Sequence, residues 1–170
     1  MTTTPQTTNP PVLPATTHSY LARAAESLSE AATSTEVTTR YACAHVAALR
    51  AAAALLAARA RPAVPIRRKP QKNAWVLLAE VAPELAEWAS FFAAGAGKRA
   101  AAEAGSSRAV TEREADDLVR DADRFLAVIE QSLGLVPHAP TLPYLVAFPG
   151  GQPALSSGQS VTQLHARRVG

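Results

Sequence analysis

The sequence contains one cysteine, Cys43, and aromatic residues make up only 5% of its 170 residues. A single cysteine excludes an intrachain disulfide and any zinc site built from paired cysteines. A small thiol among alanines is typical of a buried filler rather than of a nucleophile. Because bulky side chains are few, most of the core has to be built from small residues. The secondary-structure elements must therefore approach one another closely.

Several common catalytic patterns are also missing from the sequence. There is no glycine-rich phosphate loop, no serine-hydrolase motif and no zinc-ligand spacing. Four aspartates occur close together, but a helix would divide them between two faces, and no histidine is near them in the sequence. We therefore interpret this group as a solvated helix face and expect no metal site and no cofactor. The four residues are Asp116, Asp117, Asp121 and Asp123.

The charge and hydropathy patterns do not identify a partner or a membrane segment. The formal net charge is +3, which is too small to name a partner. The first residues, MTTTPQTTNPPVLPATT, have neither the basic segment nor the apolar stretch of a signal peptide. We find no run that approaches the ~20 apolar residues of a membrane span. These features predict a cytoplasmic protein that does not insert into a membrane.

Alanine is abundant and has the highest helix propensity of all residues. Apolar residues recur at helical spacing over residues 17–32, 34–60, 73–104 and 112–133, with Pro83 interrupting the third region. The pairs Thr33/Glu36 and Thr111/Glu114 have capping-box spacing, which predicts helix starts at both places. Gly105 and Gly134 are positioned as helix stops.

We therefore predict an all-α fold, an antiparallel helical bundle of four to five helices. The bundle domain is expected to span residues 17–134. Residues 1–16 are rich in threonine and proline and are predicted to form a disordered N-terminal tail. Residues 135–170 are rich in proline, glycine and serine and are predicted to be a flexible tail, although the stretch LPYLVAF could fold back on the domain or bind a partner.

Arg40 and His45 are the candidate catalytic pair. A histidine with a pKa near neutrality can take the proton from a ribose 2′-hydroxyl, and an arginine can stabilise charge on the phosphate. The two residues are about 140° apart around a helix, so a site within one helix would require Arg40 to fold back or the helix start to be distorted. If two copies of the protein packed together, a composite site would ease this separation. Tyr41, His45 and Leu49 lie on one helix face and are expected to line a cleft where helices meet. The alternative is that His45 is a hydrogen-bonded packing residue.

The segment between the second and third predicted helices is strongly basic and contains three prolines. This pattern indicates either a loop that contacts phosphates of a nucleic acid or another anionic partner, or simply a soluble connection. It contains no aromatic residue for base stacking, so binding would be directed at the backbone and sensitive to salt. The candidate nucleic-acid-binding residues are Arg59, Arg61, Arg67, Arg68, Lys69 and Lys72.

The stretch RYACAHVAALRAAAALLA, with YLARAAESLSEA before it, resembles the HEPN (higher eukaryotes and prokaryotes nucleotide-binding) superfamily. The later segments AWVLLAEVAPELAEWASFFAAGAGKRAAAEAG and VTEREADDLVRDADRFLAVIE are similar to a small actinobacterial branch of it. This resemblance covers residues 19–133 and implies a compact helical bundle that is commonly a homodimer and is related to RNA or nucleotides. Some members cleave RNA through an arginine–x4–6–histidine motif, which Arg40 and His45 match in spacing.

The sequence departs from the nuclease pattern in two ways. Tyr41 follows the arginine, where the nucleases frequently have a small polar residue, and the motif lies in the second helix instead of the last core helix. Our preferred interpretation is thus a binding or regulatory module for RNA, nucleotide or a protein partner. The alternatives are a metal-independent endoribonuclease of a toxin–antitoxin or defence-like system, and a structural adaptor.

Overall fold

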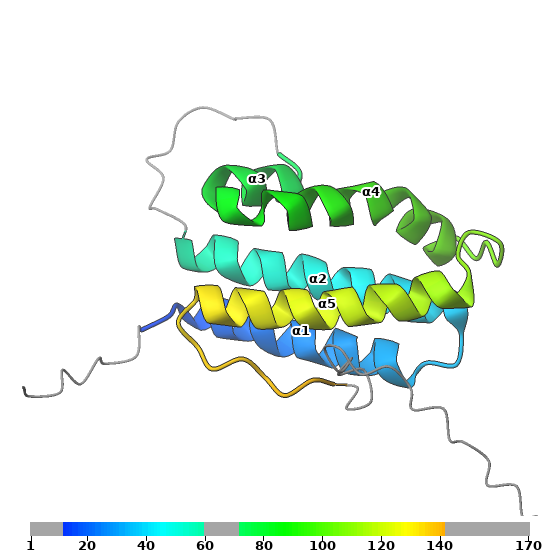
Figure 1. Ribbon diagram of the computed structural model, residues 1–170, viewed down its shortest axis with the longest axis horizontal. Helices are drawn as coiled ribbons and strands as arrows, with labels where there is room; N and C mark the ends of the chain where they lie inside the picture. The colour runs from blue at the N-terminus through cyan, green and yellow to red at the C-terminus, as the bar shows by residue number, and fades with distance from the viewer. Residues whose placement is uncertain (1–11, 60–71, 142–170) are drawn as a thin grey trace, which may run out of the picture.

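The computed structural model describes residues 12–59 and 72–141 of the chain (Figure 1). Within those ranges it contains helices and no strand, which confirms the predicted all-α helical bundle. The helices are α1 (Ala15–Thr33), α2 (Val37–Arg59), α3 (Ala74–Val81), the short 3-10 helix η1 (Pro83–Leu85), α4 (Ala86–Glu103) and α5 (Glu112–Ser132).

Helix α2 is the centre of the bundle and packs against α1, α3, α4 and α5. Figure 1 shows α3 and α4 on one side of it and α1 on the other. Alanines make up most of its buried surface, which allows the neighbouring backbones to approach closely. The buried alanines of α2 are Ala44, Ala47, Ala48, Ala51, Ala52 and Ala54.

Tryptophan and phenylalanine side chains of α3, α4 and α5 form one cluster within the described residues. Phe92 of α4 is 0% exposed. Its ring centroid lies 5.2 Å from that of Trp75, 5.9 Å from Trp88, 5.0 Å from Phe91 and 5.1 Å from Phe125. The core therefore combines small side chains on α2 with aromatic rings from α3, α4 and α5.

One of the two predicted capping boxes is present. The Thr111 hydroxyl accepts from the Glu114 backbone amide, and the Glu114 carboxylate accepts from the Thr111 amide, at the start of α5. The prediction of a capping box at Thr33 is wrong, because Thr33 is the last residue of α1 and its hydroxyl donates to the Ser29 carbonyl at 2.9 Å. Helix α2 therefore begins at Val37 rather than at residue 34.

The third helical region is divided at Pro83, the residue that interrupts the apolar spacing in the sequence. The Asn73 side chain caps α3 by accepting from the Trp75 amide at 3.0 Å. Pro83 opens η1, where its missing N–H needs no partner. Gly105 and Gly134 both have positive φ, 84° and 74°, which is the left-handed conformation that ends a helix.

The described residues continue beyond the predicted domain limits at both ends. Helix α1 begins at Ala15, within the segment expected to be disordered. Residues 135–141, which we predicted to belong to a flexible tail, turn back alongside α5 (Figure 1). The rest of both tails lies outside the described residues.

Helix α2 corrects the expectation that no segment has the length and apolarity of a membrane span. Its 23 residues satisfy that criterion by length and composition. However, 56% of its most apolar window is buried inside the bundle, as in the core helix of a soluble protein.

Candidate functional site

His45 lies in the interior of the bundle, where α2 meets α3 and α4. It is 1% exposed. Its ring is perpendicular to those of Trp75 and Phe92, with centroid distances of 5.9 and 6.0 Å. The imidazole is thus one member of the aromatic cluster.

The hydrogen bond of His45 determines its tautomer. Nε2 lies 2.8 Å from the carbonyl oxygen of Phe92. A carbonyl oxygen only accepts, so the proton is on Nε2 and the free electron pair is on Nδ1. The Nδ1 atom is itself buried and has no hydrogen-bond partner among the described residues. Burial lowers the pKa of His45 below its ordinary value of 6.5, although the bond to Phe92 opposes this shift.

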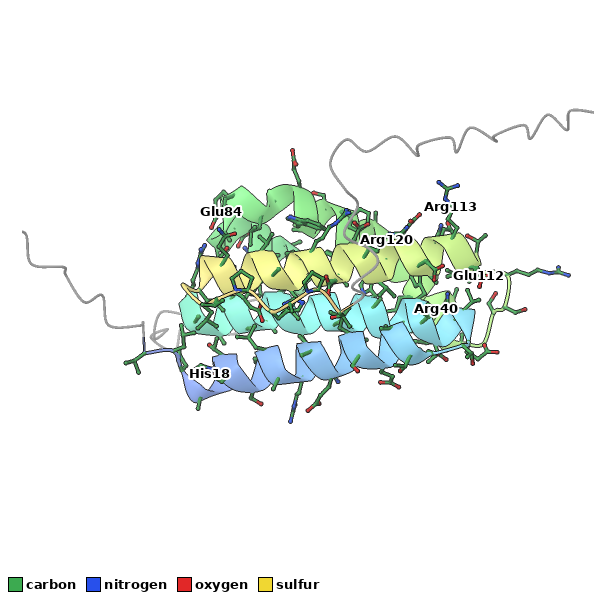
Figure 2. The ribbon with its side chains drawn as sticks, turned by 60° about the horizontal axis from the view of Figure 1, so that its bottom comes forward. His18, Arg40, Glu84, Glu112, Arg113 and Arg120 are labelled. Atoms are coloured by element: carbon green, nitrogen blue, oxygen red, sulfur yellow. The ribbon has the colours of Figure 1, made fainter. Side chains whose placement is uncertain are left out.

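Arg40 makes its hydrogen bonds and its ion pair away from His45. Its Nε donates to the Ser34 carbonyl at 3.2 Å, and its guanidinium forms an ion pair with Asp116 of α5. The side chain is 15% exposed. Figure 2 shows Arg40 at the end of the bundle where Glu112 begins α5. Arg40 therefore joins the α1–α2 connection to α5, and no hydrogen bond links it to His45.

The residues proposed to share the face of His45 are placed differently from one another. Tyr41 is 5% exposed, and its ring lines a cavity between α4 and α5. Burial raises the pKa of the Tyr41 hydroxyl, an effect that the nearby Lys98 opposes. Leu49 is half-buried and packs against the core.

Gly95 of α4 permits the close approach of this helix to Tyr41 and His45. A Cβ atom on Gly95 would lie 3.0 Å from the Tyr41 hydroxyl oxygen and 3.3 Å from Cδ2 of His45. Both distances are shorter than ordinary van der Waals contact. A side chain at residue 95 would therefore force Tyr41 and His45 to shift by a few tenths of an ångström.

Gly95→Val is expected to lower the free energy of unfolding by about 1–3 kcal/mol, because its branched side chain has to displace the two rings. Gly97→Val is the matched control in the same helix, since a Cβ there would meet nothing within 4 Å. Urea denaturation of both variants measures the difference. Equal effects of the two substitutions would contradict the close approach at residue 95.

The described members of the predicted nucleic-acid-binding set are paired with acids. Arg59 forms an ion pair with Glu84 at 2.7 Å, and Lys72 contacts Glu80 at 2.5 and 2.8 Å. These contacts neutralise part of the positive charge at each end of the basic segment. The remaining members, Arg61, Arg67, Arg68 and Lys69, lie outside the described residues.

The four aspartates are ion-paired, as a charged helix face requires, but one of them has an unexpected partner. Asp116 pairs with Arg40, Asp117 with Arg120, and Asp121 with Arg124. Asp123 instead contacts His138. This histidine is not near the four aspartates in the sequence, but it is close to Asp123 in the folded protein. Among the described residues, no group of three or more His, Cys, Asp or Glu side chains could hold a metal ion.

His138 is the polar residue that sequence reasoning missed. Its Nδ1 lies 2.8 Å from Glu130 and its Nε2 lies 3.1 Å from Asp123. Carboxylate oxygens accept, so two such bonds require a proton on both ring nitrogens and hence a charged imidazolium. Backbone amides complete the contact, since the amide of His138 donates to Glu130 and that of Thr141 donates to Asp123.

These contacts fasten residues 135–141 to α5. Burial alone would lower the pKa of His138, but the hydrogen bonds to Glu130 and Asp123 outweigh it and raise the pKa above 6.5. The sequence signal was a histidine eight residues after Glu130, which becomes informative only once the chain is known to reverse its direction at Gly134.

His138→Gln is expected to destabilise the protein by about 1–2 kcal/mol at pH 6 and by much less at pH 9. The folded state has the higher pKa, so the stabilisation is complete below 6.5 and disappears as the pH rises through the folded value. Urea denaturation at several pH values measures it. His18→Gln, at an exposed position of α1, is the control. A His138→Gln effect that is independent of pH would contradict the charged contact.

A comparison with protein-family models identifies the SAV_6107-like HEPN model, which matches residues 31–130. This range contains α2, α3, α4 and most of α5, and it is more than half of the chain. No curated protein and no solved structure gives a match. The helical bundle and the family match agree, and the chain belongs to the SAV_6107-like HEPN family.

Proposed function

We propose that this protein is a HEPN-type module that binds RNA, a nucleotide or a protein partner in the cytoplasm and does not cleave RNA. The observation that supports the absence of cleavage is the environment of His45. A general base must reach the proton that it removes, directly or through one water molecule. Nε2 of His45 is occupied by the Phe92 carbonyl, and Nδ1 is buried.

The position of Arg40 supports the same proposal. Its guanidinium is bonded to Ser34 and Asp116, so it contributes to the packing of α1, α2 and α5. Assembly of a nuclease site would require Arg40 to leave these partners and His45 to leave the aromatic cluster.

The test is incubation of labelled RNA with the purified protein in EDTA, beside the His45→Leu variant. We expect the RNA to remain intact in both reactions. Cleavage by the wild type that disappears in a folded His45→Leu variant would overturn the proposal and favour the metal-independent endoribonuclease. Equal cleavage by both proteins would show that His45 takes no part in it, and a loss of that cleavage after a second purification step would identify a contaminating nuclease.

The basic segment is the proposed contact for nucleic acid. Its affinity should depend on salt because contact with phosphates releases counterions. Changing Arg67 and Arg68 together to alanine should weaken RNA binding and reduce the slope of affinity against salt concentration. If RNA binding is unchanged, the segment has no part in it. If RNA does not bind at all and removal of the tails abolishes capture of a protein partner, the adaptor alternative is preferred.

We also propose that the protein forms a homodimer, as the HEPN resemblance implies. Large apolar residues remain exposed on α3, where Val76 is 50% exposed and Val81 40%. Surfaces of this kind are frequently covered in an assembly. Sedimentation at micromolar concentration tests the proposal, and a monomer throughout would reject it.

A further inference from the structure

Helices α4 and α5 make far fewer contacts with each other than either makes with α2. Two adjoining cavities lie between them. Their volumes are about 340 and 380 Å³. Both are lined by Phe91 and Asp121, so the two cavities adjoin, and together we call them the groove. The smaller cavity, which we call the aromatic corner, is lined by Glu87, Trp88, Phe91 and Asp121.

The two rings of the aromatic corner, Trp88 and Phe91, pack against side chains of the core. Trp88 and Phe91 are perpendicular, at 87°, with centroids 6.3 Å apart. Trp88 stacks on Phe92 at 5.9 Å and contacts Phe125 at 5.4 Å, which fixes the indole against the core. Phe91 is 46% exposed, although a phenyl ring gains from burial. The corner therefore offers a preformed apolar wall that is open to solvent.

The charges along the groove are not evenly compensated. In the larger cavity, Lys98 pairs with Glu114 and Arg120 pairs with Asp117. At the aromatic corner, Asp121 has only Arg124 at 3.5 Å, and the Arg124 side chain is 61% exposed. Glu87 has no ion-pair partner among the described residues. The corner thus has an excess of negative charge beside two aromatic rings.

The partial burial of Asp121 also favours a cation at the aromatic corner. Its side chain is 27% exposed. Burial raises the pKa of this carboxyl, an effect that Arg124 and Arg120 oppose. A carboxylate that is partly withdrawn from water gains from an additional cation, because its solvation is already incomplete.

We propose that the aromatic corner binds an organic cation, an alkylammonium or guanidinium group on a short apolar stem. The charged group lies between the carboxylates of Glu87 and Asp121, and the stem packs on Trp88 and Phe91. A cation near an aromatic ring is attracted by the ring quadrupole in addition to the carboxylates. An anion is repelled by the same carboxylates. This site is distinct from the basic segment proposed to contact RNA, so it does not depend on whether the protein binds RNA.

The test follows the indole N–H signals of the two tryptophans by NMR during titration with n-butylammonium chloride. Trp88 lines the corner, whereas Trp75 is 4% exposed in the core and serves as an internal reference. The Trp88 signal should shift and saturate while the Trp75 signal remains in place. Sodium chloride at the same concentration and neutral n-butanol are the controls, and neither should reproduce the shift.

Three variants test the role of the carboxylates. Glu87→Gln and Asp121→Asn should each weaken n-butylammonium binding about tenfold, which corresponds to 1.4 kcal/mol. Arg124→Gln should strengthen it, because the competing cation is removed; a loss of general stability would not produce this opposite sign. Glu84→Gln, whose carboxylate pairs with Arg59, should have no effect.

A titration with N-acetyl-arginine amide distinguishes the two possible sources of the cation. Tighter binding of the arginine derivative would indicate a side chain of a partner protein, and tighter binding of the free amine would indicate a small metabolite. The proposal is overturned if n-butanol shifts the Trp88 signal as strongly as n-butylammonium, if neither cation shifts it, or if the Glu87 and Asp121 variants bind as the wild type does.

Discussion

Replacing Phe92 with alanine is expected to lower the free energy of unfolding by about 3–5 kcal/mol, which is the usual cost of removing a fully buried phenyl ring. Phe92 is 0% exposed and contacts the rings of Trp75, Trp88, Phe91 and Phe125. These rings come from α3, α4 and α5, so the cavity would open where three helices meet. Urea denaturation at constant pH measures the loss.

Phe91→Ala provides a control at the adjacent position. Phe91 is 46% exposed, so it leaves a smaller cavity and its truncation should cost no more than about 1–2 kcal/mol. The chain composition is the same in the two variants, and only the position of the missing ring differs. Similar losses in both would contradict the central place of Phe92 in the cluster.

The second large effect is expected at His45. His45→Ala should cost about 3 kcal/mol, since it removes a buried side chain that contacts Trp75 and Phe92. His45→Leu conserves most of the volume and should cost less than about 1.5 kcal/mol. The Phe92 carbonyl loses the imidazole bond in both variants, so the difference between them measures packing. Thermal and urea unfolding give the two values.

The same residue predicts a dependence on pH with the opposite sign to that of His138. The folded state lowers the pKa of His45, so the unfolded chain binds a proton first as the pH falls below 6.5. Stability should therefore decrease below that pH, and His45→Leu should remove this part of the decrease. If His45→Leu is as unstable as His45→Ala, the hydrogen bond of the imidazole, rather than its volume, is the main contribution.

The exposure of His45 is the point on which the functional interpretation depends. The sequence showed an arginine and a histidine at a spacing that resembles a ribonuclease motif, and it showed that a helix would separate them by about 140°. It could not show how deep the imidazole lies, because a histidine at the edge of an apolar stripe is compatible with a cleft or with a core. The approach of α4 at Gly95 decides between them, and Gly95 is distant from His45 in the sequence.

The partners of the charged residues were likewise decided by the packing of the helices and not by the sequence pattern. An aspartate on α5 pairs with Arg40 of α2, and another pairs with His138 in the segment after α5. Such pairs depend on which helix faces are turned toward each other and on where the chain reverses. Helical spacing along α5 predicted a charged face, but it contained no information about these partners.

The sequence by itself determined the helices, their approximate limits and the bundle, because alanine propensity, apolar spacing and the Thr111 cap act over a few neighbouring residues. It misplaced the start of α2, since the Thr33 hydroxyl has a closer acceptor in the last turn of α1. Only the tertiary structure decided that His45 is buried, that His138 fastens the chain to α5 and that Glu87 and Asp121 share an aromatic corner. Each of these results depends on contacts between elements remote in the chain, and burial and charge pairing exist only once those elements have packed.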